Sequence, residues 1–306
     1  MTAPDGVLIV DKPAGMTSHD VVATVRRRLP RKTKVGHTGT LDPFATGVLP
    51  VVIGKATRLS QFLTASRKQY LATVTFGEAT DSGDLMGVMT ETASPAALAG
   101  LTEAAVHAAL ATFVGRHAQL PPAHSAKKVD GQRAYVLARR GEAVALAAVE
   151  VTAHALSLVS WDGSTHSATV RLDVSAGYYV RSLARDLGAR LGVPAHLTAL
   201  RRTASGMWSL EQAHSLADVV QCSPEDFLRL CQPLGSGLGD WPVLALNEGQ
   251  MAAVLAGRPV DLDDAQSAGL GGVRPERVRL IDATGALVAL ARPTLPRAVH
   301  ADIVLR

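Results

Sequence analysis

Apolar residues along the chain fall into runs and alternations that predict β-strands. The run at residues 6–10 is stopped soon after by Pro13, and the run at 48–53 follows a glycine-rich stretch, so both are predicted as buried strands. Residues 69–76 alternate instead, which predicts a strand with its even-numbered positions on one face. A further pair of strands is predicted across residues 150–175.

Other segments carry apolar residues at helical spacing. Thr17 and Asp20 have the spacing of a capping box, and the helix that they begin ends before Pro30 with its arginines at the C-terminal end. A second capped helix begins at Asn247 and ends at Gly257. Three more helices are predicted over residues 56–65, 101–114 and 178–191.

A change of composition divides the chain. Residues 1–235 form one predicted body, and the stretch GSGLGDWP that follows has the composition of a linker. Residues 278–291 have the pattern of two strands about a Thr-Gly turn, so residues 245–306 are predicted to form a small β-rich unit. Within the body, residues 121–150 are polar and basic, and they form either a projecting segment or a simple surface loop.

Composition narrows the class of protein. The chain has 306 residues, of which 47% are hydrophobic, enough for one large core and a second, smaller domain. No apolar run approaches the roughly 18–20 residues of a membrane span, and the start of the chain lacks the order of a secretory signal, so a cytoplasmic location is expected. Cys222 and Cys231 are too few for a disulfide framework, lack zinc-site spacing and are predicted to be buried thiols.

Charge is more informative locally than overall. A net charge of +4 favours a nucleic-acid partner only weakly. A dense basic cluster is expected where phosphates are neutralised, or at a solvated helix end. The densest cluster here comprises Arg26, Arg27, Arg28, Arg31, Lys32 and Lys34.

A single acid, Asp42, stands inside the glycine- and proline-rich segment GHTGTLDPFATGVLP. Pro43 biases Asp42 away from helical geometry, and the glycines permit turns and the close approach of a ligand. The segment therefore predicts a carboxylate presented at a fixed position, although an aspartate before proline also suits an ordinary turn.

Several motifs together resemble the TruB family of pseudouridine synthases. GTLDPFATGVLP is similar to the catalytic motif of that family, and a set of ordered motifs is far more specific than one alone. The other similar motifs occur in the family's order within residues 6–210: VDKPAGMTSHDVV, KQYLATVTFG, ATDSGD, PPAHSAKKVDGQRAY, GYYVRSLARDLG and HLTALRRTASG.

The resemblance implies an α+β pseudouridine-synthase fold: a mixed, largely antiparallel sheet with flanking helices, a thumb loop inserted at about 121–150 and a PUA-like C-terminal unit at 245–306. It implies isomerisation of the T-loop uridine at tRNA position 55, after the base is flipped out of its stack. No cofactor or metal is implied, because the reaction exchanges neither electrons nor atoms with a second substrate. The expected partner is the T-stem loop of tRNA, with no membrane, no obligatory protein partner and a monomeric enzyme.

Catalytic residues are carried over from the same motifs. Asp42 is expected to act beside the sugar, by attack at C1′ or at C6 or by stabilising cationic character, with or without a glycal intermediate. Arg181, in the motif GYYVR, is expected to hold that carboxylate ionised. Tyr70 is expected to stack on the flipped base and is a candidate for proton transfer at the sugar.

Further residues are expected to bind the substrate or support the site. Tyr179 takes the family's tyrosine position, although the adjacent Tyr178 leaves open which ring faces the pocket. His37 is expected near the T-loop bases, Leu200 in an apolar wall of the uracil pocket and Lys12 behind the site. A phosphate-binding surface is expected from the basic cluster together with Lys127, Lys128, Arg133, Arg201 and Arg202.

Three other functions compete with this reading. A related synthase could modify another RNA with the help of a guide, but the length and the thumb favour the stand-alone tRNA enzyme. An RNA-binding folding factor would need only the basic surface, whereas Asp42, Tyr70 and Arg181 are all present. A two-domain α/β hydrolase would need a nucleophile elbow, a metal-ligand cluster or a phosphate-binding loop, and the sequence has none of these patterns.

Overall fold

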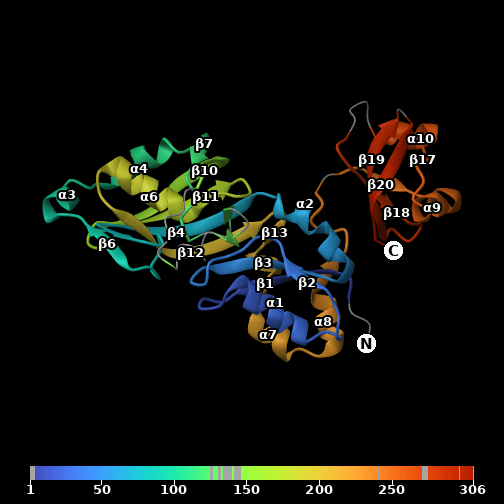
Figure 1. Ribbon diagram of the computed structural model, residues 1–306, viewed down its shortest axis with the longest axis horizontal. Helices are drawn as coiled ribbons and strands as arrows, with labels where there is room; N and C mark the ends of the chain where they lie inside the picture. Colours follow the sequence, from blue (N-terminus) through green and yellow to red (C-terminus); the bar gives the residue numbers. More distant parts are fainter. Residues whose placement is uncertain are drawn as a thin grey trace.

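A mixed sheet runs through the body of the protein, and a second, smaller sheet forms the C-terminal unit (Figure 1). The computed structural model describes residues 4–124, 127–129, 132–133, 140, 146–239, 241–270, 275–295 and 297–305. The main path of the large sheet is, in spatial order, β14 (His214–Ser215), β1 (Gly6–Lys12), β3 (Thr46–Ile53), β12 (Ala195–Ser205), β4 (Lys68–Phe76), β11 (Ser167–Val174), β10 (Val149–Asp162) and β7 (Gly115–Gln119).

Neighbouring strands of this sheet are mostly antiparallel, and the contacts of β1 with β14 and of β3 with β12 are parallel. The predicted α+β fold is therefore confirmed. Three short strands extend the sheet, namely β2 (Val35–His37) beside β3, β13 (Trp208–Ser209) beside β12 and β15 (Cys231–Pro233) beside β1. Outside it, β5 (Glu78–Thr80) and β6 (Met89–Thr92) form a separate antiparallel pair.

Helices cover one face of the sheet and bury its larger apolar cluster. The cluster draws on five helices: α1 (Ser18–Arg27), α4 (Glu103–Ala111), α6 (Val180–Leu191), α7 (Leu216–Gln221) and α8 (Pro224–Leu230). The helix α1 begins as predicted, because the Thr17 Oγ1 accepts from the Asp20 amide at 3.1 Å and the Asp20 carboxylate accepts from the Thr17 amide at 2.9 Å. A short helix, α3 (Pro95–Ala99), follows β6.

The strand β1 is buried on both faces. Leu8 and Val10 face the helices, whereas Val7 and Ile9 face a second cluster that includes Leu59 from the 3-10 turn η1 (Gly54–Leu59) and Leu63 from α2 (Ser60–Thr64). A strand enclosed in this way needs apolar residues at consecutive positions, which explains the unbroken run in the sequence.

The parallel seam between β3 and β12 determines where the candidate site lies. Along this seam Arg202 pairs with Gly47 of β3, and on its other side Arg202 pairs with Tyr70 of β4. Gly47 has φ 104°, and a Cβ there would lie 2.2 Å from the Arg202 carbonyl oxygen, so only glycine permits this approach. The register therefore places Gly47, Arg202 and Tyr70, which come from three separate segments of the sequence, in one row at the start of β3.

Some elements differ from the sequence prediction. The central strand β12 was not predicted, and it is stabilised by pairing with β4, far along the chain. The strand β2 lies inside the segment predicted as a long loop, and it pairs with β3, the next strand. The helix predicted over 56–65 is divided into η1 and α2. Cys222 and Cys231 are half-buried, not buried as predicted, because each lies at the end of a short helix at the edge of the core.

The C-terminal unit has its own sheet and its own apolar cluster. Its strand order is β16 (Val243–Ala245), β18 (Val278–Ile281), β19 (Leu287–Leu295), β20 (Ala298–Val304) and β17 (Val260–Asp261), with helices α9 (Glu248–Leu255) and α10 (Asp264–Gly269) beside it. The guanidinium of Arg277 stacks 4.5 Å from the ring centroid of Phe62, which also packs edge-on against Trp241. These contacts join the unit to α2 of the body.

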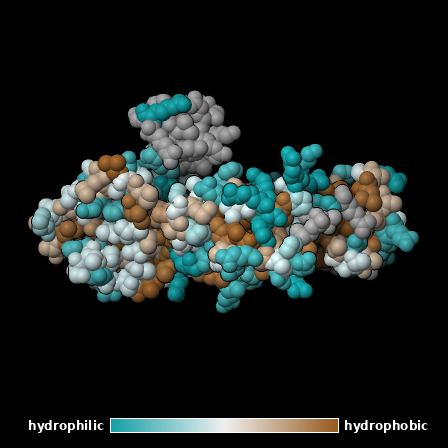
Figure 2. Space-filling view, turned by 90° about the horizontal axis from the view of Figure 1, so that it is seen from below, coloured by the Kyte–Doolittle hydropathy of each residue, from teal (hydrophilic) through white to brown (hydrophobic). Residues whose placement is uncertain are grey.

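The predicted thumb lies largely outside the described residues. Of its length, Lys128–Val129 and Gln132–Arg133 are described as the paired strands β8 and β9. On the face shown in Figure 2, hydrophilic side chains gather across the middle and hydrophobic ones form small patches between them. Within the part of the chain that is described, no helix is long and apolar enough to cross a membrane.

Candidate active site

The loop that carries Asp42 is clamped on both sides of that residue. The Ser18 hydroxyl accepts from the Leu41 amide at 2.8 Å, and the Pro43 carbonyl accepts from the Gly15 amide at 2.8 Å. Buried Lys12 adds a second donor to the Pro43 carbonyl at 3.1 Å. The backbone conformation at Asp42 is therefore held from two other segments of the N-terminal region.

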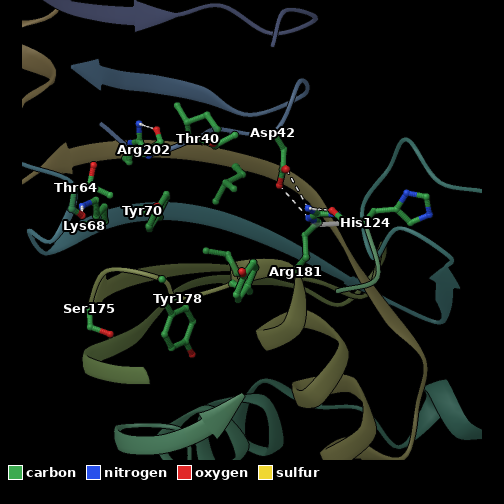
Figure 3. A pocket seen from close by; sticks show the side chains of 16 residues that line it. Thr40, Asp42, Thr64, Lys68, Tyr70, His124, Ser175, Tyr178, Arg181 and Arg202 are labelled. Atoms are coloured by element: carbon green, nitrogen blue, oxygen red, sulfur yellow. Dashed lines mark hydrogen bonds and ion pairs between the residues drawn. The ribbon is translucent and has the colours of Figure 1, made fainter. Parts of the chain in front are cut away.

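Arg181 meets the Asp42 carboxylate with two parallel bonds (Figure 3). Its Nε lies 2.9 Å from Oδ2 and its Nη2 donates to Oδ1 at 3.0 Å. This bidentate arrangement fixes the direction of both side chains. Arg181 is the second residue of α6 and is 8% exposed, whereas the Asp42 side chain is 29% exposed. The carboxylate is thus the member of the pair that a ligand can reach.

A second carboxylate completes the surroundings of Arg181. Asp84 lies 3.3 Å from the Arg181 Nη1, and its Oδ1 accepts from the Ser82 hydroxyl at 2.8 Å and from the Met86 amide at 3.0 Å. Arg181 also donates to the carbonyls of Ser82 and His124, both at 2.9 Å. One guanidinium therefore binds two acids and two carbonyls, which leaves it little freedom to turn.

Burial raises the pKa of Asp42 above its usual range; the Arg181 guanidinium opposes this rise and the Asp84 carboxylate adds to it. A carboxylate with a raised pKa is a stronger base than an ordinary carboxylate. The ammonium of Lys12 also lowers the Asp42 pKa. Lys12 itself has a pKa lowered to about 8, chiefly by burial.

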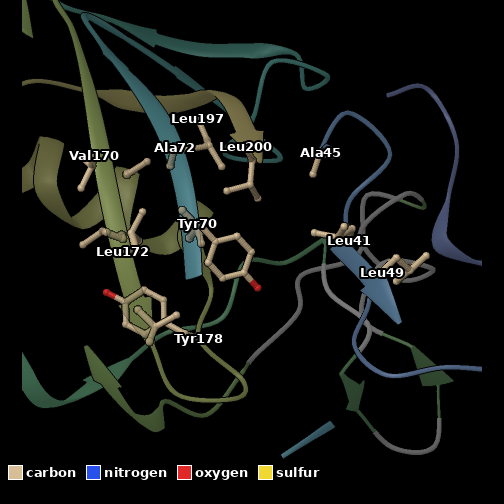
Figure 4. Close-up of a cluster of buried hydrophobic side chains, with 14 of the residues drawn as sticks. Leu41, Ala45, Leu49, Tyr70, Ala72, Val170, Leu172, Tyr178, Leu197 and Leu200 are labelled. Atoms are coloured by element: carbon tan, nitrogen blue, oxygen red, sulfur yellow. The ribbon is translucent and has the colours of Figure 1, made fainter. Parts of the chain in front are cut away.

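Asp42 and Arg181 open onto a cavity of about 290 Å³. Tyr70 and Leu200 line the same cavity and are 8% and 7% exposed. In Figure 4 the ring of Tyr70 projects from the apolar cluster beside Leu200, with Leu172 on its other side. The cavity thus has the ion pair between Asp42 and Arg181 at one end and an aromatic and aliphatic wall along its length.

Both neighbouring tyrosines line this cavity, in different ways. Tyr178 is 8% exposed and packs edge-on against His117, and its hydroxyl has no hydrogen-bond partner among the described residues. Tyr179 is half-buried, and its backbone is held by Gln119, which donates to the Tyr179 carbonyl at 2.9 Å and accepts from its amide at 2.8 Å. Burial raises the pKa of Tyr179, and Arg181 opposes the rise.

Other predicted residues lie elsewhere. His37 lies in β2 beside a separate pocket with Arg26 and Lys34, not in the Asp42 cavity. The backbones of Lys128 and Arg133 are paired, and their side chains fall outside the described part of the structure. Arg202, predicted in a phosphate-binding surface around the Asp42 pocket, lines the cavity itself and is 1% exposed, because the alternation of β12 turns it inward.

Sequence reasoning missed two residues, Asp84 beside Arg181 and Lys68 in the cavity wall. Asp84 directly follows Gly83 in the DSGD loop. An acid next to a turn-forming glycine is the signal that could have suggested it. Lys68 lines the cavity and is 5% exposed, although lysine in front of a strand usually predicts a solvated side chain. Within the described ranges, no group of three or more His, Cys, Asp or Glu residues could hold a metal ion.

Comparison with known families identifies the family of the chain. A family model described as the N-terminal domain of TruB family pseudouridylate synthases matches residues 26–180, and a model of the tRNA pseudouridylate synthase B C-terminal domain matches residues 181–238. The chain belongs to the TruB family. Asp42, Tyr70 and Tyr179 lie in the first matched segment, and Arg181 begins the second.

Relatives match nearly the whole chain. A protein named tRNA pseudouridine synthase B from Solibacter usitatus is 43% identical over 98% of this chain and 100% of its own length. Another with that name, from Thermobifida fusca, is 46% identical over 84% of this chain and 86% of its own. This TruB-family chain is therefore similar to complete tRNA-modifying enzymes.

Solved structures agree on the fold. The crystal structure of a Cbf5-Nop10-Gar1 complex contains a chain with a TM-score of 0.74 and 27% identity, matched over 99% of this chain and 85% of that one. An H/ACA RNP bound to a substrate RNA containing 2′-deoxyuridine gives a TM-score of 0.72 and 25% identity, over 99% and 85%. The predicted pseudouridine-synthase fold is thus confirmed.

Proposed function

We propose that this protein is a tRNA pseudouridine synthase that isomerises the T-loop uridine. The observation that carries the proposal is the Asp42 carboxylate, held by two bonds from Arg181 at the edge of a cavity with Tyr70 in its wall. Such an arrangement suits a reaction at one nucleotide that has left its stack.

The reaction breaks the bond between uracil N1 and ribose C1′, turns the base and forms a bond from C5 to C1′. C5 loses one proton and N1 gains one, so the sum of atoms is unchanged. A fixed carboxylate stabilises positive character at C1′ or bonds covalently during this exchange. Tyr70 offers a flat surface for the free base, and its hydroxyl is a candidate for the proton transfer at the sugar.

Several further features belong to the same proposal. The basic cluster at residues 26–34 and the C-terminal unit contact the backbone of the T-stem loop, and residues 121–150 act as a thumb on it. The chain works as a cytoplasmic monomer without a protein partner. A rival function, an RNA-folding factor in which catalysis is secondary, would leave the ion pair between Asp42 and Arg181 without a purpose.

The variant Asp42→Asn tests the proposal, because it keeps the shape of the side chain and removes its charge. We expect no measurable pseudouridine in a T-loop transcript, with RNA affinity within about threefold of the unmodified protein, since one group buried beside the sugar carries little of the backbone affinity. Pseudouridine mapping and a gel-shift titration measure the two properties.

Asp11→Asn is the matched control. Asp11 is 31% exposed and pairs with Arg201 at 2.7 Å, much as Asp42 pairs with Arg181, but it does not line the cavity. It should retain normal turnover. Turnover by Asp42→Asn at the rate of Asp11→Asn would reject the proposed function.

A further inference from the structure

Two buried cations lie at the end of the cavity opposite the ion pair between Asp42 and Arg181. Lys68 is 5% exposed and Arg202 is 1% exposed. Figure 3 shows both near Thr64, with Tyr70 between them and the ion pair. Removing a cation from water costs several kcal/mol unless an opposite charge compensates for it.

Neither cation has such a charge beside it in the described part of the chain. The Lys68 ammonium donates to the carbonyl oxygens of Thr64 and Ser66, both at 2.6 Å, and to the Ser66 hydroxyl at 3.2 Å. Burial, with a smaller contribution from the nearby Arg202, lowers the pKa of Lys68 to about 8. Neutral acceptors satisfy the hydrogen bonds but do not balance the charge.

Arg202 has a donor group to spare. Its Nε donates to the Val48 carbonyl at 2.6 Å and its Nη2 to the Gly39 carbonyl at 3.1 Å, while Nη1 donates to no described residue. Asp42, the only carboxylate among the described residues that line the cavity, is engaged by Arg181 at the other end, and Arg181 also engages Asp84. An anion from outside could therefore pair with Lys68 and Arg202 without competing for an acid of the protein.

Gly39 marks the space between the two cations. A Cβ at Gly39 would lie 3.6 Å from the Arg202 Nη1 and 3.8 Å from the Lys68 Cε, and Gly39 itself lines the cavity. Its φ of 107° disfavours any side chain there. The backbone at Gly39 therefore passes between the two positive groups without a side chain that would fill the space.

We propose that Lys68 and Arg202 form a subsite for one backbone phosphate that flanks the flipped uridine. The inference rests on the proposed function. In this inference the sugar lies beside Asp42, and one of the phosphates bonded to it follows the cavity wall toward Lys68 and Arg202. Its negative charge offsets the cost of burying the two cations, so nucleotide entry is favoured by electrostatics as well as by stacking.

Neutral methylphosphonate linkages in a T-stem-loop RNA test the subsite. One RNA carries the linkage on the 5′ side of the target uridine and another on its 3′ side. Affinity is measured by fluorescence anisotropy in the Asp42→Asn background, so that no product forms. We expect one of the two linkages to weaken binding about tenfold.

The variant Lys68→Gln links that loss to this residue. It should bind the unmodified RNA about tenfold more weakly, show no further loss with the sensitive linkage, and lower the slope of log affinity against log salt by about 1. Lys68→Arg, which keeps the charge, should stay sensitive to the linkage. Lys55→Gln is the control, because Lys55 is 48% exposed and pairs with Asp5 on the surface. It should also stay sensitive.

A structural role for Lys68 predicts a different result. Lys68→Gln would then weaken binding of all three RNAs by the same factor, and this outcome would overturn the inference, as would an absence of loss with either linkage. If thermal unfolding shows that Lys68→Gln does not fold, the affinities of the three RNAs for the protein that retains Lys68 decide the test. Wild-type protein that forms no pseudouridine would reject the proposed function, independently of the linkage result.

Discussion

The Asp42 carboxylate lies edge to edge with the Arg181 guanidinium, with contacts of 2.9 and 3.0 Å that use Nε and Nη2. The remaining nitrogen, Nη1, faces Asp84 at 3.3 Å. Arg181 therefore orients the carboxylate as well as balancing its charge. A point charge at the same place would do only the second.

Arg181→Lys separates these two roles. A lysine keeps the positive charge but cannot make the two parallel bonds, so we expect turnover to fall at least about 100-fold from misplacement of Asp42. RNA affinity should change little. Arg185→Lys, on the same helix and 43% exposed, serves as the control. Single-turnover kinetics measure the effect, and equal rates for the two variants would contradict the orienting role.

Asp84→Asn tests the electrostatic coupling through the pH dependence of turnover. Asp42 must be ionised to act, so activity falls as the pH drops through its pKa, which burial raises above the usual range. Since the Asp84 charge adds to that rise, its removal lowers the pKa of Asp42. The acid limb of the rate profile should therefore move to lower pH, even where the maximum rate is reduced. An acid limb that stays in place or moves upward would contradict the coupling.

Lys12→Met tests the support of the Asp42 loop. Lys12 is fully buried and donates to the carbonyls of Pro13, Met16 and Pro43, which the variant leaves without this donor. We expect a loss of about 1–3 kcal/mol in the free energy of unfolding by urea. The exposed Lys55→Met should lose less than about 1 kcal/mol.

The same variant has a signature at high pH. The pKa of Lys12 is lowered to about 8 in the fold, from an ordinary value of 10.5, so the unfolded chain binds more protons between these values. The contribution of Lys12 to stability therefore rises as the pH increases through this window. The difference in unfolding free energy between wild type and Lys12→Met should grow from pH 8 toward pH 10. A constant difference would contradict the lowered pKa.

Gly47→Ala tests the seam between β3 and β12. A methyl group there would meet the Arg202 carbonyl at 2.2 Å and would also require the unfavourable φ of 104°. Gly257→Ala isolates the second effect, because Gly257 has φ 68° and open space around it. The control should lose about 1–2 kcal/mol, and Gly47→Ala more. Equal losses of unfolding free energy in urea would show that the contact between a methyl group at position 47 and the Arg202 carbonyl has no cost.

Local signals in the sequence determined much of the secondary structure. The capping box of Thr17 and Asp20 starts α1, and the alternation in residues 69–76 places Tyr70 on the buried face of β4. These features depend on neighbours within a few residues, so short-range periodicity and capping chemistry suffice to predict them. The family motifs added the pairing of Asp42 with Arg181, which no local pattern contains.

Other features depended on the tertiary structure. Asp42 and Arg181 are 139 positions apart, and Asp84 joins them only because its loop is hydrogen-bonded to Leu197 of β12. Arg202 was predicted among the phosphate-binding residues around the Asp42 pocket, and the register of β12 between β3 and β4 turns it into the cavity. From the sequence alone came many of the helices and strands, though not β12 or β2, and the acid that stands in a rigid loop. Only the folded sheet decided which charges are buried together, because strand register is a long-range property that shifts every side chain at once.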